Sequence, residues 1–304
     1  MVTLRTRTIA TRDGVRLRTA SWDARTGVPD RGLCVILDGQ TEYLEKYTEV
    51  VDELGARGFS GAILDWRGQG GSDRALTDPL KAHVRDFSEF DLDLAAFMDQ
   101  VVVPMSARPA IALAHSMGAH ILLRRLHDHP DTFRAAVMTA PMLRPSTRNH
   151  PAWLVRMVCR AYSFCGAGNA WVWGMQKRDP LKIAFEDNLV TSDRGRFARA
   201  QAQLAAQADL RLAGPTWGWL EAAYASMAQM TEPGYAQAIA VPCLIFGAGR
   251  DRIVETGAIR DFAKRLPRGE YVEFADAEHE ILMENDSIRA RFWAAFDDFV
   301  TRTA

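Results

Sequence analysis

The chain has 304 residues, of which 48% are apolar and 25% charged, so it can bury a large core and has an ordinary globular composition. Its formal net charge of −1 argues against a nucleic-acid partner. The first residues form no apolar signal segment, and no apolar run reaches the roughly eighteen residues that span a bilayer. We therefore expect a cytoplasmic protein, with a peripheral position at the inner face of the membrane left open.

Strand and helix patterns alternate along the first half of the chain. Residues 3–22 alternate in polarity around the turn Asp13-Gly14 and predict a hairpin. Short apolar runs predict buried strands at residues 33–37, 61–65, 110–113 and 135–138. Helical spacing is found at residues 47–57, 87–103 and 117–127. This alternation predicts an α/β fold with a mostly parallel central sheet and helices on both faces.

The alternation stops near residue 142. From there to residue 236 we find helical patterns, no convincing strand, and five of the eight tryptophans. Strands are again predicted at 242–247 and 271–274, followed by a helix at 287–300. The simplest division is a core of residues 1–141 and 237–304, interrupted by a helical cap of residues 142–236.

A serine lies where the strand at 110–113 meets the following helix. Residues 114–118 read Ala-His-Ser-Met-Gly, close to the G-x-S-x-G of a nucleophile elbow, in which a sharp turn exposes the serine hydroxyl. Ala114 stands where that motif has its first glycine. Ser116 could instead be the N-cap of the helix, since serine is favoured there.

A serine nucleophile needs a base, and the base needs a carboxylate that orients it. In an open α/β sheet these groups lie at the carboxyl ends of strands. Asp251 follows the strand at 242–247, and His279 follows the strand at 271–274. The chain order Ser116, Asp251, His279 is that of the α/β-hydrolases.

Each of these residues also has a structural interpretation, and each has rivals. Asp251 could cap a helix near residue 256, and His279 could be an ordinary loop histidine. Asp276 and Glu278 are alternative partners for His279, but they lie close to it in sequence, which favours Asp251. His115 is a rival base, which we expect to point away along the strand.

Acyl transfer also requires hydrogen-bond donors for the oxyanion. We expect one donor to be the backbone N–H of Met117 and the other the backbone N–H of Gln40, in the loop after the strand at 33–37. Gly39 permits a tight backbone path there. Asp38 is a concern, because an ionised carboxylate that pointed inward would oppose the oxyanion.

Five segments resemble the lysophospholipase L2 and monoacylglycerol lipase group of α/β-hydrolases, of the serine aminopeptidase S33 type. Two of them are residues 39–47, GQTEYLEKY, and residues 64–72, LDWRGQGGS. The others are residues 116–118, 188–193 and 214–217, and the similarity extends over about residues 12–300. The sequence departs from the group at Asp38, where relatives often carry histidine, and at Ala114. We also expect an ion pair between Glu42 and Arg67 behind the oxyanion loop.

The resemblance implies a serine carboxylester hydrolase that acts on a single-chain lipid ester, such as a lysophospholipid or monoacylglycerol, through a Ser-His-Asp triad and an acyl-enzyme. It implies no metal and no organic cofactor. The cap is expected to act as a lid that contacts substrate, and transiently a membrane surface, through Trp153, Trp171, Trp217 and Trp219. These tryptophans could instead only pack the cap onto the core. The alternatives are a small-ester, lactone or peptide hydrolase, or a silent ligand-binding homologue.

Overall fold

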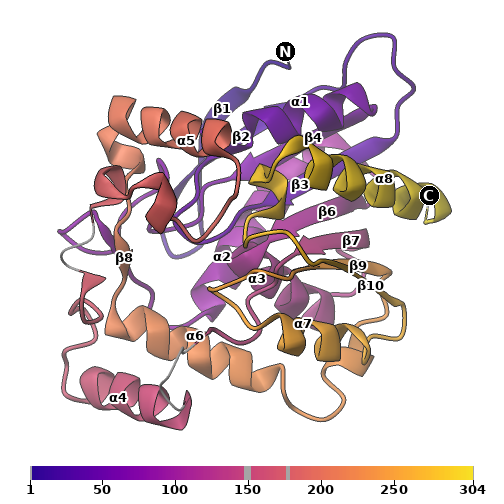
Figure 1. Ribbon diagram of the computed structural model, residues 1–304. Coiled ribbons are helices and arrows are strands. Elements are labelled where there is room, and N and C mark those ends of the chain that lie inside the picture. The colour runs from indigo at the N-terminus through magenta and orange to yellow at the C-terminus, as the bar shows by residue number, and fades with distance from the viewer. Residues whose placement is uncertain (1, 147–151, 176–178, 304) are drawn as a thin grey trace.

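An eight-stranded sheet forms the centre of the protein (Figure 1). The computed structural model describes residues 2–146, 152–175 and 179–303. The strands lie in the order β1 (Arg5–Ala10), β2 (Arg16–Trp22), β4 (Phe59–Leu64), β3 (Gly32–Leu37), β6 (Ala110–His115), β7 (Phe133–Thr139), β9 (Cys243–Ala248) and β10 (Gly269–Phe274). β2 pairs antiparallel with β1 and with β4, and all other pairs are parallel. The predicted α/β class and mostly parallel sheet are confirmed.

Helices cover both faces of this sheet. Along β3, Cys34 and Ile36 face a core cluster that contains α1 (Thr48–Ala56) and α8 (Asp286–Arg302). Val35 and Leu37 face the opposite cluster, with α2 (Ser88–Phe97), α3 (Ser116–Asp128) and α7 (Thr256–Ala263). Strands with helices on both sides are apolar at every position, which explains why they appear in the sequence as continuous apolar runs.

Two predicted helices are divided in the structure. The segment 87–103 becomes α2, one π-helical turn over Met98–Val102 and a 3₁₀ turn over Val103–Met105. Pro104 lies in that last turn and has no N–H to continue an α-helical ladder. The segment 47–57 begins earlier, with a 3₁₀ turn over Leu44–Tyr47 that leads into α1.

The segment between β7 and β9 contains the helices α4 (Ala152–Phe164), α5 (Arg194–Ala206) and α6 (Trp217–Gln229). It also contains the short strand β8 (Gly214–Pro215), which pairs with β5 (Lys81–Ala82). This strand contradicts the expectation of an all-helical segment; two residues that include a proline give no alternating pattern. Residues 147–151 and 176–178 of the predicted cap lie outside the described residues. No helix of the described chain is both long and apolar enough to cross a membrane.

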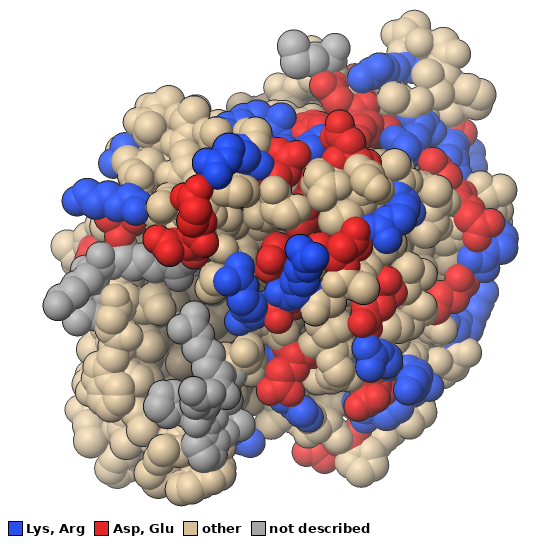
Figure 2. Space-filling view, viewed as in Figure 1, with Lys and Arg blue, Asp and Glu red and all other residues tan. Residues whose placement is uncertain are grey.

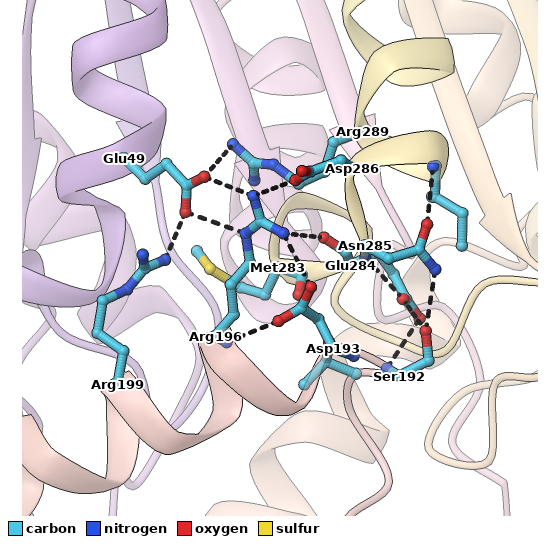
Figure 3. A network of polar contacts seen from close by, with 12 residues as sticks. Glu49, Ser192, Asp193, Arg196, Arg199, Met283, Glu284, Asn285, Asp286 and Arg289 are labelled. Atoms are coloured by element: carbon cyan, nitrogen blue, oxygen red, sulfur yellow. Dashed lines mark hydrogen bonds and ion pairs between the residues drawn. The ribbon is translucent and has the colours of Figure 1, made fainter.

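Helix α5 is attached to the core by an ion-pair network (Figure 3). Glu49 on α1 accepts hydrogen bonds from Arg196 and Arg199 on α5 and lies 3.7 Å from Arg289 on α8. Arg196 also contacts Asp286, at 2.7 Å. Partial burial alone would raise the pKa of Glu49, but the hydrogen bonds from the two α5 arginines lower it to about 2. The network therefore holds one wall of the functional cavity described below.

Candidate active site

Ser116 lies on a sharp turn between β6 and α3. Its φ of +48° lies in the left-handed region, which is strained for residues other than glycine. α3 begins at Ser116 with His115 at the N-cap, so Ser116 is not the N-cap of the helix. A Cβ on Gly118 would lie 2.2 Å from the carbonyl oxygen of Leu37, so only glycine lets α3 pass this close to β3. The local geometry is that of a nucleophile elbow.

The carboxyl ends of three strands bring Ser116, His279 and Asp251 together. His279 Nε2 lies 3.0 Å from Ser116 Oγ, and His279 Nδ1 lies 2.6 Å from Asp251 Oδ2. The other oxygen of Asp251 accepts the backbone N–H groups of Ile253 and Val254, at 2.8 and 2.9 Å. Burial alone would raise the pKa of Asp251, but the charge and hydrogen bond of His279 lower it. The arrangement can take a proton from Ser116 and stabilise the resulting imidazolium.

The rival carboxylates have other partners. Asp276 is exposed and pairs with Arg291 at 2.6 Å. Glu278 lies 3.5 Å from Arg252. Neither lies within hydrogen-bond distance of His279 among the described contacts.

The loop after β3 leaves a backbone N–H free beside Ser116. Glu42 accepts the N–H of Gly39 at 2.6 Å, and Gln69 donates to the carbonyl oxygen of Gly39 at 2.7 Å. Thr41, with φ of +65°, turns the chain between them. Within the described part of the chain, no protein acceptor takes the N–H of Gln40. The N–H of Met117 lies in the first turn of α3, where helices leave such groups unpaired.

His115 lies beside His279, and our expectation that it points away is wrong. The two rings have centroids 4.8 Å apart, and His115 lines the same cavity as Ser116. Burial lowers the pKa of His115 to about 4, against the attraction of Glu42, so its neutral ring donates from Nδ1 to the carbonyl oxygen of Thr139. The parity of the strand gives the reason, since His115 shares the α1/α8 face with Leu113.

Asp38 and Glu42 differ from expectation. Asp38 is fully buried, and neither of its carboxyl oxygens has a hydrogen-bond partner among the described residues. Burial raises the pKa of Asp38, and the charges of Asp65 and Glu42 raise it further, so the neutral acid is favoured. A neutral Asp38 would repel an oxyanion less than an ionised one. The predicted pair of Glu42 with Arg67 is wrong: Arg67 pairs with Asp93 at 2.7 Å.

Ser116 and His279 lie in the wall of a cavity of about 280 Å³. Its other walls come largely from the segment between β7 and β9. This segment contributes the apolar residues Pro180, Ile183, Leu189, Val190, Phe197, Ala200, Leu204, Leu212 and Ala213, and the polar residues Asn188, Thr191, Arg196, Arg199, Gln201 and Gln203. Polar groups lie near the serine, among them Gln40, Lys46 and Glu280. Apolar and polar side chains thus both line the cavity in which Ser116 and His279 lie.

The four tryptophans that we assigned to substrate do not line this cavity. Trp217 stacks on Tyr162 with centroids 4.7 Å apart, and Trp219 meets Phe87 edge-on at 5.6 Å, both within the core. Trp171 lies beside the ammonium of Lys81, 5.5 Å from its ring centroid. Trp153 is 67% exposed on α4. The structure shows the packing role for Trp217 and Trp219, because α6 buries them against the core.

All residues of this site lie within the range that one family model matches. The family model described as Serine aminopeptidase, S33 matches residues 28–286. The chain belongs to this family. Lysophospholipase L2 of Escherichia coli strain K12 is 34% identical over 278 residues, covering 88% of this chain and 80% of that protein. Monoacylglycerol lipase of Mycolicibacterium smegmatis is 31% identical over 128 residues, covering 42% of this chain and 43% of that protein.

Solved structures show that this S33-family chain has the predicted α/β-hydrolase fold. A soluble variant of monoglyceride lipase from Saccharomyces cerevisiae, in complex with a substrate analogue, has a TM-score of 0.79 at 17% identity, covering 100% of this chain and 96% of that one. A carboxyl esterase from Bacillus coagulans, in complex with glycerol, has a TM-score of 0.76 at 13% identity, covering 100% and 99%. Fold and family together identify the chain as a hydrolase.

Proposed function

We propose that this enzyme is a serine carboxylester hydrolase that acts on a single-chain lipid ester, a lysophospholipid or a monoacylglycerol. The observation that carries the proposal is the hydrogen-bonded series Ser116, His279 and Asp251, at the wall of a cavity that many apolar side chains line. The relatives named lysophospholipase L2 and monoacylglycerol lipase support this choice.

In the proposed mechanism, Ser116 Oγ attacks the ester carbonyl while His279 Nε2 accepts its proton. Asp251 holds the ring in the tautomer that leaves Nε2 free and stabilises the imidazolium that forms. His279 then gives the proton to the departing alcohol, which leaves an acyl group on Ser116. Water, activated by the same histidine, releases the fatty acid and restores the serine.

The oxyanion of each tetrahedral intermediate is assigned to the backbone N–H groups of Gln40 and Met117. The free N–H of Gln40 and the first turn of α3 support this assignment. A pair of preorganised donors in a buried site typically contributes about 10²–10³ in rate per donor. The roles require no metal and no organic cofactor.

The size and walls of the cavity support a single acyl chain. Its volume of about 280 Å³ lies just below the range of ligand pockets, which span about 300–1,000 Å³. The side chains of Ile183, Phe197, Leu204 and Leu212 form its apolar part. We propose that residues 142–236, which supply these side chains, act as the lid over the ester.

The test combines a variant with a series of substrates. Ser116→Ala is expected to abolish hydrolysis of p-nitrophenyl esters and labelling by a fluorophosphonate, whereas Ser88→Ala, at an exposed serine of α2, keeps both. Turnover is expected to rise with acyl length, and long-chain lysophosphatidylcholine and monoacylglycerol to be cleaved. Undiminished turnover by Ser116→Ala would contradict the mechanism.

A preference for short acyl groups would favour the second candidate, a small-ester, lactone or peptide hydrolase. The family description, which names an aminopeptidase, is the observation in its favour. A protein that neither hydrolyses any of these substrates nor reacts with the fluorophosphonate would instead be the silent binding homologue.

We also propose that the cap meets the inner face of the membrane through α4. Trp153, Met157 and Phe164 are 67%, 53% and 93% exposed, and they lie on one side of the helix with Arg156 and Arg160. α4 contains no acidic residue. This part of the molecule carries few charged side chains on the face shown in Figure 2. An exposed apolar stripe with arginines suits an anionic lipid surface.

Binding to vesicles tests this contact. The enzyme is expected to sediment with vesicles that contain phosphatidylglycerol, and Phe164→Ser to weaken that binding without loss of activity on a short soluble ester. Val103→Ser removes a 60% exposed apolar side chain outside α4 and serves as the control. Equal loss of binding in both variants would contradict a surface centred on α4.

A further inference from the structure

Lys46 lies between two buried carboxylates that the mechanism above does not use. Its Nζ is 2.8 Å from Glu42 and 2.6 Å from Glu280. All three side chains are almost entirely buried, and Lys46 and Glu280 border the cavity beside His279. Charges of this kind are costly to bury, so an arrangement that keeps three of them together needs an explanation beyond stability.

The two carboxylates belong to the two loops on which catalysis depends. Glu42 accepts the N–H of Gly39 at 2.6 Å and so fixes the residue directly before the oxyanion donor Gln40. Glu280 directly follows His279, and its own N–H donates to the carbonyl oxygen of Val190 in the cap at 2.7 Å. Lys46 therefore ties the oxyanion loop to the loop of the base, and through Glu280 to the cavity wall.

The group also carries net charge. With both carboxylates ionised, one ammonium leaves an excess of one negative charge beside His279. Burial alone would raise the pKa of Glu42, but Lys46 lowers it to about 2, helped by the hydroxyl of Tyr47, which donates at 2.6 Å. Among the described residues, Lys46 is the one side-chain partner of Glu280, and burial raises the pKa of Glu280. Glu280 is thus the member whose charge is most easily removed.

We propose that Lys46 is a positioning residue which, with Glu42 and Glu280, fixes the oxyanion loop relative to the loop of the base. The net negative charge of the three groups favours the protonated form of His279 in the transition state. This inference rests on the proposed hydrolase mechanism. The other titratable groups that face His279 are Asp251, from the loop after β9, and neutral His115, from β6. On the cavity side, the phenol of Tyr43 lies near Lys46.

The first test is Glu280→Gln, which keeps the shape and removes the charge. The acidic limb of the pH profile of kcat/KM is expected to move to lower pH by about half a unit to one unit, because a carboxylate that favours the protonated imidazole is gone. kcat is expected to fall and KM to stay unchanged. Glu270→Gln makes the same chemical change at a half-exposed residue at the start of β10, where Glu270 pairs with Arg302, and is expected to leave the profile unmoved.

The second test is the pair Lys46→Met and Lys46→Arg. Lys46→Met leaves the carboxylates of Glu42 and Glu280 without their shared ammonium. It is expected to lower kcat by about tenfold or more, because neither loop is then held by an ion pair to Lys46. Lys46→Arg should restore most of that loss, and the double variant Lys46→Met with Glu280→Gln should be more active than Lys46→Met alone. Lys264→Met, at an exposed lysine after α7, is the matched control.

An unmoved acidic limb in Glu280→Gln would overturn the charge role, and equal kcat for Lys46→Met and Lys46→Arg would overturn the positioning role. Circular dichroism identifies any variant that fails to fold, and Glu280→Gln then still decides the question. If wild-type turnover survives in Ser116→Ala, the hydrolase mechanism itself fails. If Ser116→Ala is inactive but the Lys46 and Glu280 variants behave like the wild type, the hydrolase mechanism stands and this inference fails.

Discussion

The left-handed backbone at Ser116 predicts that glycine at this position gives a more stable protein than alanine does. Ser116 has φ of +48°, where a side chain costs about 1–2 kcal/mol and glycine costs nothing. The informative comparison is Ser116→Gly with Ser116→Ala. Both variants lack the hydroxyl that contacts His279, so the loss of that hydrogen bond cancels between them.

The size of the difference follows from two opposing terms. Relief of the strained φ favours the glycine variant by about 1–2 kcal/mol, and the extra freedom of glycine in the unfolded chain opposes it by about 0.5–1 kcal/mol. Ser116→Gly should therefore exceed Ser116→Ala by about 0.5–1 kcal/mol in free energy of unfolding. With about 2.1 cal/mol/K of unfolding entropy per residue over 304 residues, this corresponds to about 1–1.5 °C in Tm.

Equilibrium urea unfolding and calorimetry measure this difference. The control is Ala198→Gly, at an exposed position within α5 with ordinary helical backbone, where the same change costs about 1 kcal/mol. The sign of the alanine-to-glycine effect should thus be opposite at the two positions. A glycine variant at position 116 that is less stable than the alanine variant would refute the assignment of strain to the elbow.

Three further predictions concern the same edge of the sheet. Asp251→Asn is expected to lower kcat for ester hydrolysis by about 10⁴-fold with the fold intact, because the amide favours the wrong tautomer of His279. Asp38→Asn is expected to stabilise the protein increasingly as pH rises above about 4. The raised pKa of Asp38 means that the folded state keeps a proton that the unfolded chain releases, so wild-type stability falls with rising pH, as urea unfolding at several pH values would show. Gly118→Ala is expected to lower Tm and activity together, since its Cβ would lie 2.2 Å from a backbone oxygen of β3.

Each of these predictions has an outcome that contradicts it. Full activity in Asp251→Asn would show that another group orients His279. A constant difference between wild type and Asp38→Asn over the pH range would show that the carboxyl does not titrate abnormally. Wild-type Tm in Gly118→Ala would show that α3 can move away from β3 without cost.

The sequence predicts the parts of this protein that local pattern determines. Apolar runs followed by polar residues locate the strand ends, and parallel strands must bring those ends to one edge, so the proximity of Ser116, Asp251 and His279 could be foreseen. Their catalytic roles stay a prediction. The parity of β6 could also have placed His115, because it shares a face with Leu113.

The walls of the cavity could not be predicted in the same way. They depend on where α5 lies on the core, which long-range contacts such as that of Arg196 with Glu49 determine. The tryptophans could not be assigned for the same reason, because their positions in the sequence are the same whether their side chains line a cavity or pack a helix onto the core. Glu42 pairs with Lys46, four residues further along the chain, and not with the more distant Arg67.

β7 and β9 are neighbours in the sheet, although the whole segment from residue 140 to residue 242 separates them along the chain. Adjacent strands are about 4.8 Å apart, so the pairing of β7 with β9 does not fix the length or shape of the segment that joins them. If the proposed function holds, most of the substrate-contacting residues and the reacting residues are encoded in different stretches of the gene. An engineer could exchange the intervening segment for one of another length or shape and retain the β6 elbow and the strand ends after β9 and β10, obtaining new substrates from unchanged chemistry.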